Sequence, residues 1–241
     1  GQPLDRHCFN QRLPQKARLA LFLQVCSAVA FAHAHGVLHR DIKPSNVLVD
    51  TDGSTRLLDF GIAQLLGDED RLAPRAFTPG FASPEQVAGE PLSAASDVYQ
   101  LGRLLAAIMS ENEADFATVL ANAAVPTSGN VRPDGELLPV IPPHLPADLV
   151  AILTMACRSE PFQRYATVEA LAEDIRALLD NRPVTARPRT ARYLMGRFIQ
   201  RHPWAVAASI AGFFITLSAT AVFVISLQAE RDAADHQARI A

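Results

Sequence analysis

One eight-residue stretch constrains this chain of 241 residues more than any other feature of its sequence. Residues 39–46, HRDIKPSN, place a carboxylate (Asp41), an ammonium (Lys43) and an amide (Asn46) within six residues. Pro44 has no N–H group and disfavours helical geometry at the residue before it, so the stretch cannot continue a regular helix. It therefore predicts a fixed loop that presents three polar groups of different chemistry.

A second polar loop is predicted thirteen residues beyond Asn46, where residues 59–61 (Asp-Phe-Gly) end an apolar run. Runs typical of short β-strands precede both loops and should hold them at adjacent strand ends. These runs cover residues 37–38, 46–49 and 55–58, with an Asp-Gly turn at residues 52–53.

Together the two loops offer a base, a cation, an amide oxygen and a second carboxylate. Transfer of a phosphoryl group to a hydroxyl uses that set of groups. The base accepts the hydroxyl proton, oxygen ligands hold Mg²⁺ on the phosphates, and the cation spreads the developing charge. The residues therefore indicate phosphoryl-transfer chemistry.

The order and spacing of these residues resemble the H-R-D-x-x-x-x-N and D-F-G loops of bacterial eukaryotic-like (Hanks-type) serine/threonine protein kinases. Residues 83–85 (Ser-Pro-Glu) stand where that family has A-P-E, and residues 97–102 look like its following helix. Arg164 stands where the family has the arginine that pairs with that glutamate. Lys43, two residues after Asp41, marks the serine/threonine class. The resemblance covers residues 1 to about 180.

The resemblance implies catalytic roles and two cofactors, ATP and Mg²⁺. Asp41 would be the catalytic base, Lys43 would contact the γ-phosphate, and Asn46 and Asp59 would be the Mg²⁺ ligands. Leu48 would lie under the adenine ring, although an ordinary core position explains it equally well. The expected nucleotide site is thus Lys43, Asn46, Leu48 and Asp59.

Five further residues are expected to support this site. Thr78 would bridge the catalytic Asp and Lys, unless it only forms a Thr-Pro turn. Asp97 would accept hydrogen bonds from the backbone of residues 39–46, the catalytic loop of the family, although a first-turn acid is also favoured by the helix dipole. The remaining three are Arg40, which binds an activating phosphate in many kinases, and the expected buried ion pair of Glu85 with Arg164.

Residues 62–82 correspond to the activation segment, yet no Ser, Thr or Tyr occurs between Gly61 and Phe77. Many kinases are activated when a phosphate in this stretch pairs with the arginine of H-R-D. Our hypothesis is that an acid of residues 68–70 (Asp-Glu-Asp) pairs with Arg40 instead. The alternative is a solvated acidic turn.

The expected fold class is mainly α: a helical bundle like the C-terminal lobe of a protein kinase, with short β-hairpins that carry the catalytic loops. Residues 1–14 read as a turn and a short helix, and Thr167 as an N-cap. The three cysteines are far apart and predict buried apolar groups rather than a metal site. Helices are predicted at residues 15–35, 93–110, 116–123, 147–158 and 167–179.

A membrane span is predicted near the C-terminus, where residues 204–227 contain no charged side chain. As a helix this segment would be ~36 Å long, against ~30 Å of hydrocarbon. Six arginines and no acid lie between Arg182 and His202, which places the preceding domain in the cytoplasm by the positive-inside rule. These arginines could also bind anionic lipid, although topology alone explains them.

The expected organisation is a kinase lobe (1–180), a basic juxtamembrane linker (181–203), one transmembrane helix (204–227) and an extracytoplasmic start of a helical region (228–241). This corresponds to a single-pass protein of the inner (cytoplasmic) membrane. Only 38 residues precede His39, and they contain no Gly-rich loop and no strand lysine. We therefore expect the smaller kinase lobe to be missing from this chain, which alone should have no appreciable kinase activity.

Three functions are compatible with the sequence. A membrane-linked serine/threonine kinase would act on protein substrates, as a monomer or as a homodimer. A truncated kinase-like protein would serve as a non-catalytic scaffold, and a small-molecule phosphotransferase would use a related loop. Residues 83–85 and Arg164 argue against the last, because they belong to the protein-substrate segment. The net charge of -3 gives no reason to expect nucleic-acid binding.

Overall fold

A computed structural model of the chain describes residues 1–60, 80–111, 116–119, 141–142 and 144–240, with side chains up to residue 228. The described chain forms two compact units, Gly1–Arg189 and Thr190–Ala241.

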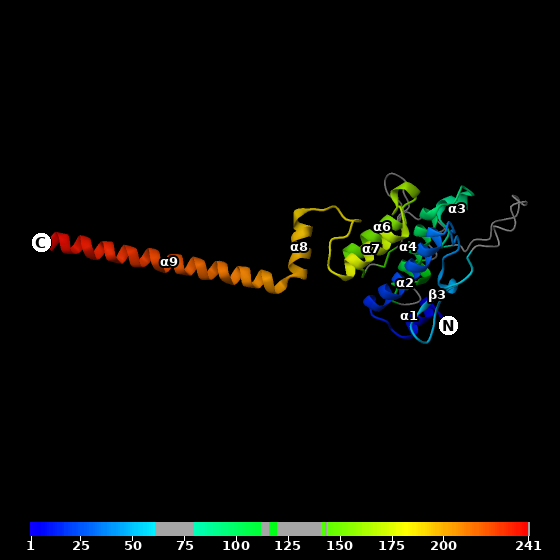
Figure 1. The fold of residues 1–241 in the computed structure, drawn as a ribbon, viewed down its shortest axis with the longest axis horizontal. Helices are drawn as coiled ribbons and strands as arrows, with labels where there is room; N and C mark the ends of the chain where they lie inside the picture. The colour runs from blue at the N-terminus through cyan, green and yellow to red at the C-terminus, as the bar shows by residue number, and fades with distance from the viewer. Residues whose placement is uncertain (61–79, 112–115, 120–140, 143, 241) are drawn as a thin grey trace, which may run out of the picture. The chain divides into compact units, whose positions relative to one another are not determined.

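The first unit is mainly helical, as predicted from the sequence. Its longest helix, α2, packs against α7, and α4 packs against α6. The bundle is therefore built from segments far apart in the chain (Figure 1). Residues 116–119 are also helical. The helices are α1 (Leu4–Asn10), α2 (Gln15–Ala34), α3 (Pro84–Ala88), α4 (Ala94–Ile108), α6 (Ala147–Ala156) and α7 (Val168–Leu179), with 3₁₀ turns η1 (Pro44–Asn46) and η3 (Pro161–Gln163).

Side-chain caps fix where the helices begin. Ser93 caps α4 by accepting a hydrogen bond from the N–H of Ala95, while the hydroxyl of Ser96 accepts one from the N–H of Ser93. Thr167 caps α7 by accepting from the N–H of Ala170 at 3.2 Å, which confirms the predicted N-cap. Such caps satisfy amide donors that have no partner within the helix.

A small antiparallel sheet has the strand order β1-β2-β3, with β1 at Gln2–Pro3, β2 at Val47–Val49 and β3 at Thr55–Leu57. The hairpin predicted around the Asp-Gly turn is present, and Gly53 there has a φ of 80°. The strand predicted at residues 37–38 is wrong. The N–H of Val37 donates to the carbonyl oxygen of Ala32, so this residue closes the end of α2 instead. Strand β1 was not predicted, because two residues carry no periodicity.

The core lies between α2, α4, α6 and α7. The predicted apolar face of α2 is buried, and α4 is buried on almost every side. Gly102 allows the close contact of α4 with the end of α6, because an added Cβ would lie 2.7 Å from Cys157 Sγ. All three cysteines are buried and free, as predicted.

The chain immediately after α7 remains packed on the first unit. Val184 is fully buried, and Asp174 of α7 accepts hydrogen bonds from the N–H and hydroxyl of Thr185 at 2.7 and 2.8 Å. Arg187 pairs with the buried carboxylate of Asp148 at 2.6 Å. The compact unit thus extends to Arg189.

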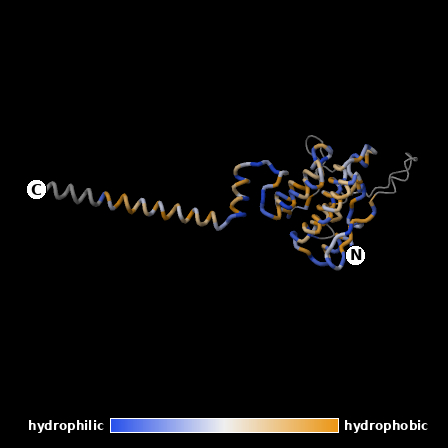
Figure 2. The backbone as a smooth tube through the Cα atoms, viewed as in Figure 1, coloured by the Kyte–Doolittle hydropathy of each residue, from blue (hydrophilic) through white to orange (hydrophobic). Residues whose placement is uncertain are grey.

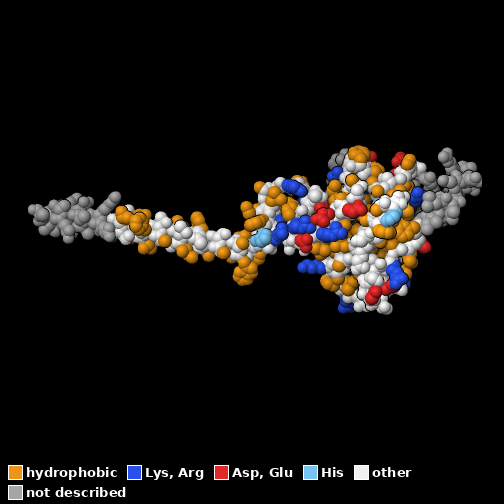
Figure 3. Space-filling view, viewed as in Figure 1, with side chains coloured by type: hydrophobic (Ala, Val, Ile, Leu, Met, Phe, Trp, Pro, Cys, Tyr) orange, Lys and Arg blue, Asp and Glu red, His pale blue; other side chains and the backbone are white. Residues whose placement is uncertain are grey.

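The second unit consists of two helices, α8 (Ala191–Arg201) and α9 (Pro203–Ile240). Two described helices are long and apolar enough to span a membrane, α2 and residues 203–228 of α9. The first has seven residues buried in the core of the lobe, whereas none of the second window is buried. Apolar residues follow α9 over most of its length (Figure 2), and its visible face carries no charged side chain before the grey segment (Figure 3).

Candidate active site

The loop at residues 39–46 brings its three polar groups into direct contact. Lys43 Nζ lies 2.7 Å from Asp41 Oδ2. The amide nitrogen of Asn46 donates to the same carboxylate oxygen at 3.0 Å and to the carbonyl oxygen of Asp41 at 2.8 Å. Pro44 occupies the first position of the 3₁₀ turn, where a missing N–H is tolerated. The predicted fixed loop is therefore present.

The second loop is joined to the first through backbone contacts. The N–H of Leu58 donates to the carbonyl oxygen of Asn46 at 2.8 Å, so Asp59 follows directly from a residue bound to the catalytic loop. Asp59 has a φ of 53° and its side chain is exposed. A left-handed backbone is uncommon for a non-glycine residue and needs support from its surroundings.

His39 is a second link between the loops, which the sequence did not single out. Its Nε2 lies 2.9 Å from the carbonyl oxygen of Leu58, and the N–H of Asp41 donates to its Nδ1 at 3.3 Å. A carbonyl oxygen only accepts, so Nε2 carries the proton and the imidazole is neutral. Burial lowers the pKa of His39 against the opposing influence of Asp97, which favours the same neutral form.

Asp97 holds the backbone of the catalytic loop from α4, in the arrangement expected from the family resemblance. Its two carboxylate oxygens accept hydrogen bonds from the N–H groups of His39 and Arg40, each at 2.8 Å. Arg40 has a φ of 68°, and these bonds help to hold that strained conformation. The carboxylate of Asp97 is fully buried, which makes it a rigid support.

His33 also contacts this buried carboxylate, with Nε2 2.7 Å from Asp97 Oδ2. From the sequence alone, His33 has no assigned role at this site. The structure instead makes it the link between the end of α2 and Asp97. Helical spacing cannot reveal such a contact, because the two residues are 64 positions apart.

Two glutamine side chains form a further support that the sequence did not reveal. Gln100 donates to the carbonyl oxygen of Arg40 at 2.8 Å and accepts from the N–H of Ile42 at 2.8 Å. Gln86 of α3 donates to the same carbonyl oxygen at 3.0 Å. The catalytic loop is therefore held by α3 and α4 together.

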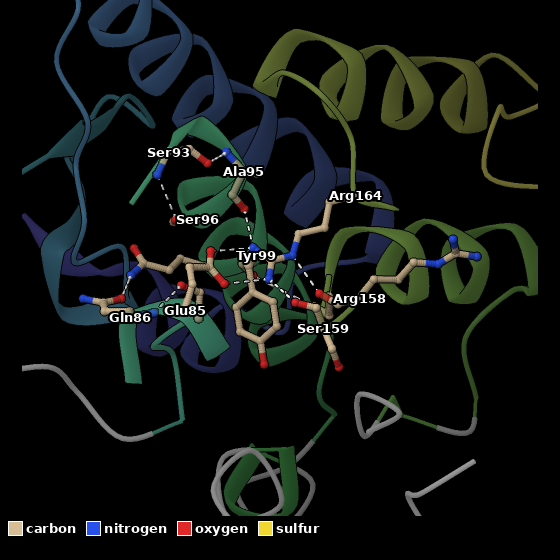
Figure 4. A network of polar contacts seen from close by, with 12 residues as sticks. Glu85, Gln86, Ser93, Ala95, Ser96, Tyr99, Arg158, Ser159 and Arg164 are labelled. Atoms are coloured by element: carbon tan, nitrogen blue, oxygen red, sulfur yellow. Dashed lines mark hydrogen bonds and ion pairs between the residues drawn. The ribbon is translucent and has the colours of Figure 1, made fainter. Parts of the chain in front are cut away.

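The expected ion pair between Glu85 and Arg164 is present and buried (Figure 4). Arg164 Nη1 and Nη2 lie 2.7 and 2.8 Å from the two carboxylate oxygens. This bidentate geometry is the strong form of a charge-assisted hydrogen bond. Burial alone would raise the pKa of Glu85, but hydrogen bonds from Arg164 and Ser96 outweigh it and lower the pKa from 4.5 to about 2.

The guanidinium of Arg164 has a partner for every N–H. Besides Glu85, it donates to the carbonyl oxygens of Ala95, Arg158 and Ser159 at 2.7 to 2.9 Å. Its carbon lies 5.0 Å from the ring centre of Tyr99, and burial raises the pKa of that phenol to about 12. Because an arginine has five N–H donors, this site satisfies them all.

The residues present fit a magnesium–nucleotide complex in their chemistry. The NH₂ group of Asn46 points at Asp41, which leaves its amide oxygen as an acceptor, and Asp59 offers an exposed carboxylate. Among the described residues no three His, Cys, Asp or Glu side chains could hold a metal by themselves. Phosphate oxygens would have to complete the shell, as Mg²⁺ sites commonly require.

Three predicted positions remain, of which two are described and one is not. Leu48 lies half-buried in the central strand β2. Arg40 Nε is buried and has no hydrogen-bond partner among the described residues. The acids of residues 68–70, which our hypothesis pairs with Arg40, lie outside the described residues, and so does Thr78.

The fold and these polar contacts define a class of protein. One loop brings a carboxylate, an ammonium and an amide into contact, and a buried Glu–Arg pair holds the helix α3 that follows. A helical lobe with these features is built like the larger lobe of a protein kinase. Comparison with known proteins agrees. A family model described as "Protein kinase domain" matches residues 2–175. This chain belongs to that family.

Similar bacterial proteins are named as serine/threonine-protein kinases. A probable serine/threonine-protein kinase of Streptomyces coelicolor is 31% identical over 184 residues, which cover 75% of this chain and 27% of that protein. Serine/threonine-protein kinase PknB of Mycolicibacterium smegmatis is 32% identical over 171 residues, 67% of this chain and 26% of that protein. The chain thus spans about a quarter of the length of these relatives.

Proposed function

We propose that this chain is part of a serine/threonine protein kinase that transfers the γ-phosphate of ATP to hydroxyl groups of protein substrates. The observation that supports this most directly is the contact of Lys43 and Asn46 with one carboxylate oxygen of Asp41. A protein-substrate kinase is favoured over a small-molecule phosphotransferase by the buried pair of Glu85 with Arg164. That pair fixes helix α3, which follows the segment where a protein substrate would bind.

In the proposed mechanism Asp41 accepts the proton of the substrate hydroxyl as that oxygen attacks the γ-phosphorus of ATP, and the bond from this phosphorus to the bridging oxygen breaks so that ADP leaves. Lys43 and the NH₂ group of Asn46 fix the direction of this carboxylate. Lys43 would also contact the transferred phosphate and share its charge with it. Asn46 and Asp59 would hold Mg²⁺ on the nucleotide, which neutralises the phosphate charge.

The remaining supports act on position rather than on the reacting atoms. Asp97 holds the N–H groups of two loop residues, and His39 keeps Leu58, and with it Asp59, beside the loop. Preorganised groups of this kind reduce the reorganisation needed in the transition state. Leu48 would contact the adenine ring from strand β2.

We also propose that residues 204–227 span the inner membrane once, with the kinase lobe in the cytoplasm and residues 228–241 outside it. Within residues 203–228 of α9, the most apolar 18-residue window has a mean hydropathy of 2.2. The six arginines before it support this orientation through the positive-inside rule. The role that we propose for such a membrane-bound kinase is signalling.

The assay for the proposed activity uses the natural protein that contains this chain, because the chain spans only about a quarter of its relatives. Transfer of labelled phosphate from ATP to protein serine and threonine is measured with Mg²⁺ present. Asp41→Asn should reduce the rate by roughly 10²–10⁴-fold, the usual contribution of a general base. Glu169→Gln, at an exposed acid of α7, is the matched control and should leave the rate unchanged.

Two results would favour the other functions. If the natural protein binds protein partners but neither it nor Asp41→Asn transfers phosphate, the scaffold function replaces the kinase. If phosphate appears on small hydroxyl compounds and not on protein, the phosphotransferase function does.

A further inference from the structure

Helix α8 carries an apolar face that the rest of the second unit leaves exposed. Its four large apolar side chains are 39% to 59% exposed, and none of its residues is buried. At 100° per residue these side chains fall on one side of the helix, whereas three arginines and a glutamine fall on the other. The apolar face consists of Leu194, Met195, Phe198 and Ile199, and the polar face of Arg192, Arg197, Gln200 and Arg201.

The charge of this segment has one sign. All six charged side chains between residues 182 and 202 are arginines, and three of them lie on the polar face of α8. On that face Arg197 donates to Gln200 at 3.0 Å and lies 5.9 Å from the ring centre of Tyr193. A helix with this distribution fits a surface that is apolar below and negatively charged above.

The position of α8 in the chain indicates that this surface is the one at which the proposed membrane span begins. The backbone leaves helical geometry at His202 (φ -127°, ψ 54°), and Pro203 begins α9 (Figure 1). The single tryptophan of the chain, Trp204, is 86% exposed in the first turn of α9. Tryptophan is enriched at the boundary between headgroups and hydrocarbon. Helix α8 therefore ends where the proposed span begins.

We propose that α8 is an interfacial anchor that lies in the headgroup layer of a bilayer containing anionic lipids. Its apolar face enters the boundary of the acyl chains, and its arginines bind lipid phosphates. This inference rests on the proposed membrane span, because α9 delivers α8 to the interface. A second copy of the chain is a poorer occupant of the apolar face, because pairing through that face would leave the arginines of the polar face without anionic partners, and residues 182–202 contain no acid.

The test uses the full chain, reconstituted in vesicles of phosphatidylcholine alone or of phosphatidylcholine mixed with phosphatidylglycerol. A spin label is placed on the apolar face at Phe198→Cys and, as the matched control, on the polar face at Gln200→Cys. The native cysteines are buried and should label little. Accessibility to oxygen, which dissolves in lipid, is compared with accessibility to a water-soluble nickel chelate.

In mixed vesicles the label at residue 198 should be accessible to oxygen and shielded from nickel, and the label at residue 200 should show the reverse. In phosphatidylcholine alone the shielding at residue 198 should weaken. Replacement of Arg192 or Arg201 by Gln should weaken the partitioning of α8 on the order of fivefold for each arginine.

Fluorescence of Trp204, with brominated lipid as quencher, reports on the span separately. If Trp204 is quenched but residues 198 and 200 are equally accessible to nickel, the interfacial anchor is wrong and the span stands. If Trp204 is not quenched and carbonate extracts the chain, both proposals fail. Dipolar broadening between Phe198→Cys labels on two copies would show that the apolar face pairs with itself, which would also overturn the anchor.

Discussion

Gln100 donates its amide to the side-chain oxygen of Gln86 at 2.8 Å, and both amides also donate to the carbonyl oxygen of Arg40. Residue 86 belongs to α3 and residue 100 to α4. The two helices therefore meet on a single backbone carbonyl of the catalytic loop. That carbonyl belongs to Arg40 itself, whose φ of 68° would be costly without such support.

Removal of this support should reduce phosphate transfer more than nucleotide binding. Gln100→Leu leaves the N–H of Ile42 without its acceptor and the carbonyl oxygen of Arg40 with one donor fewer. Each unsatisfied buried group costs about 1–3 kcal/mol. We expect kcat of the natural protein to fall roughly tenfold or more, while KM for ATP changes little, as measured by steady-state kinetics. Gln11→Leu, at an exposed position of the same lobe, is the control.

Loss of one partner of the buried ion pair should destabilise the lobe strongly. Arg164→Met leaves the Glu85 carboxylate buried without its cation, and such losses cost about 3–5 kcal/mol. Urea unfolding of the chain in detergent, followed by circular dichroism, measures this change. The double variant Glu85→Gln/Arg164→Met should recover part of it, because no uncompensated charge remains. A double variant as unstable as the sum of the two single variants would contradict this explanation.

The same pair predicts an acid-dependent loss of stability. The pKa of Glu85 falls from 4.5 to about 2 on folding, so the folded state binds fewer protons between these values. The stabilisation is complete above pH 4.5 and is lost as the pH falls towards 2. Glu85→Gln should remove this part of the pH dependence. If the stability of Glu85→Gln depended on pH in the same way as that of the unchanged chain, other carboxylates would be responsible for the acid sensitivity.

The contact between α4 and α6 should not tolerate a methyl group at Gly102. A Cβ there would lie 2.7 Å from Cys157 Sγ and 2.9 Å from Ala156 Cβ. Overpacking of this kind typically costs about 1–3 kcal/mol, which thermal unfolding of Gly102→Ala would detect. Gly102→Ala/Cys157→Ala should recover part of the loss. Gly196→Ala, where nothing lies within 4 Å, should not destabilise the chain.

The three thiols should be unreactive in the folded chain. Burial raises the pKa of Cys8 and of Cys157 to about 11, and it raises the pKa of Cys26 as well. Only the thiolate reacts with disulfide reagents, so labelling at pH 8 should be slower than for a free cysteine by on the order of 100-fold or more. Denaturant should release all three at once. Rapid labelling of one thiol under native conditions would show that its surroundings open locally.

The parts of the fold that could be predicted are those encoded by local sequence. Long apolar periodicity gave helices α2, α4 and α7, and Thr167 gave the start of one of them. The loop at residues 39–46 was predictable because proline and three functional groups occur together in sequence. Strand β1 was missed, since two residues such as Gln2 and Pro3 have no pattern and gain their structure by pairing with β2.

The supports of the site could not be predicted for a different reason. The catalytic loop and Asp97 are contacted by side chains that lie 46 to 64 residues away in the sequence, those of His33, Gln86 and Gln100. A glutamine in a helix looks like a solvated residue when only the sequence is known. Its role becomes visible once tertiary packing has removed water from around it.

The burial of α4 also determines how the lobe can open. Twelve of its fifteen residues are buried, and it touches the core from several sides. Backbone amides in such a helix exchange their hydrogens with solvent only when the whole cooperative unit unfolds. The hairpin of β2 and β3, which is partly exposed, can open at lower free energy. Asp97 and Gln100 thus belong to the most slowly exchanging part of the lobe, and the catalytic loop rests on a support that stays closed while its surroundings fluctuate.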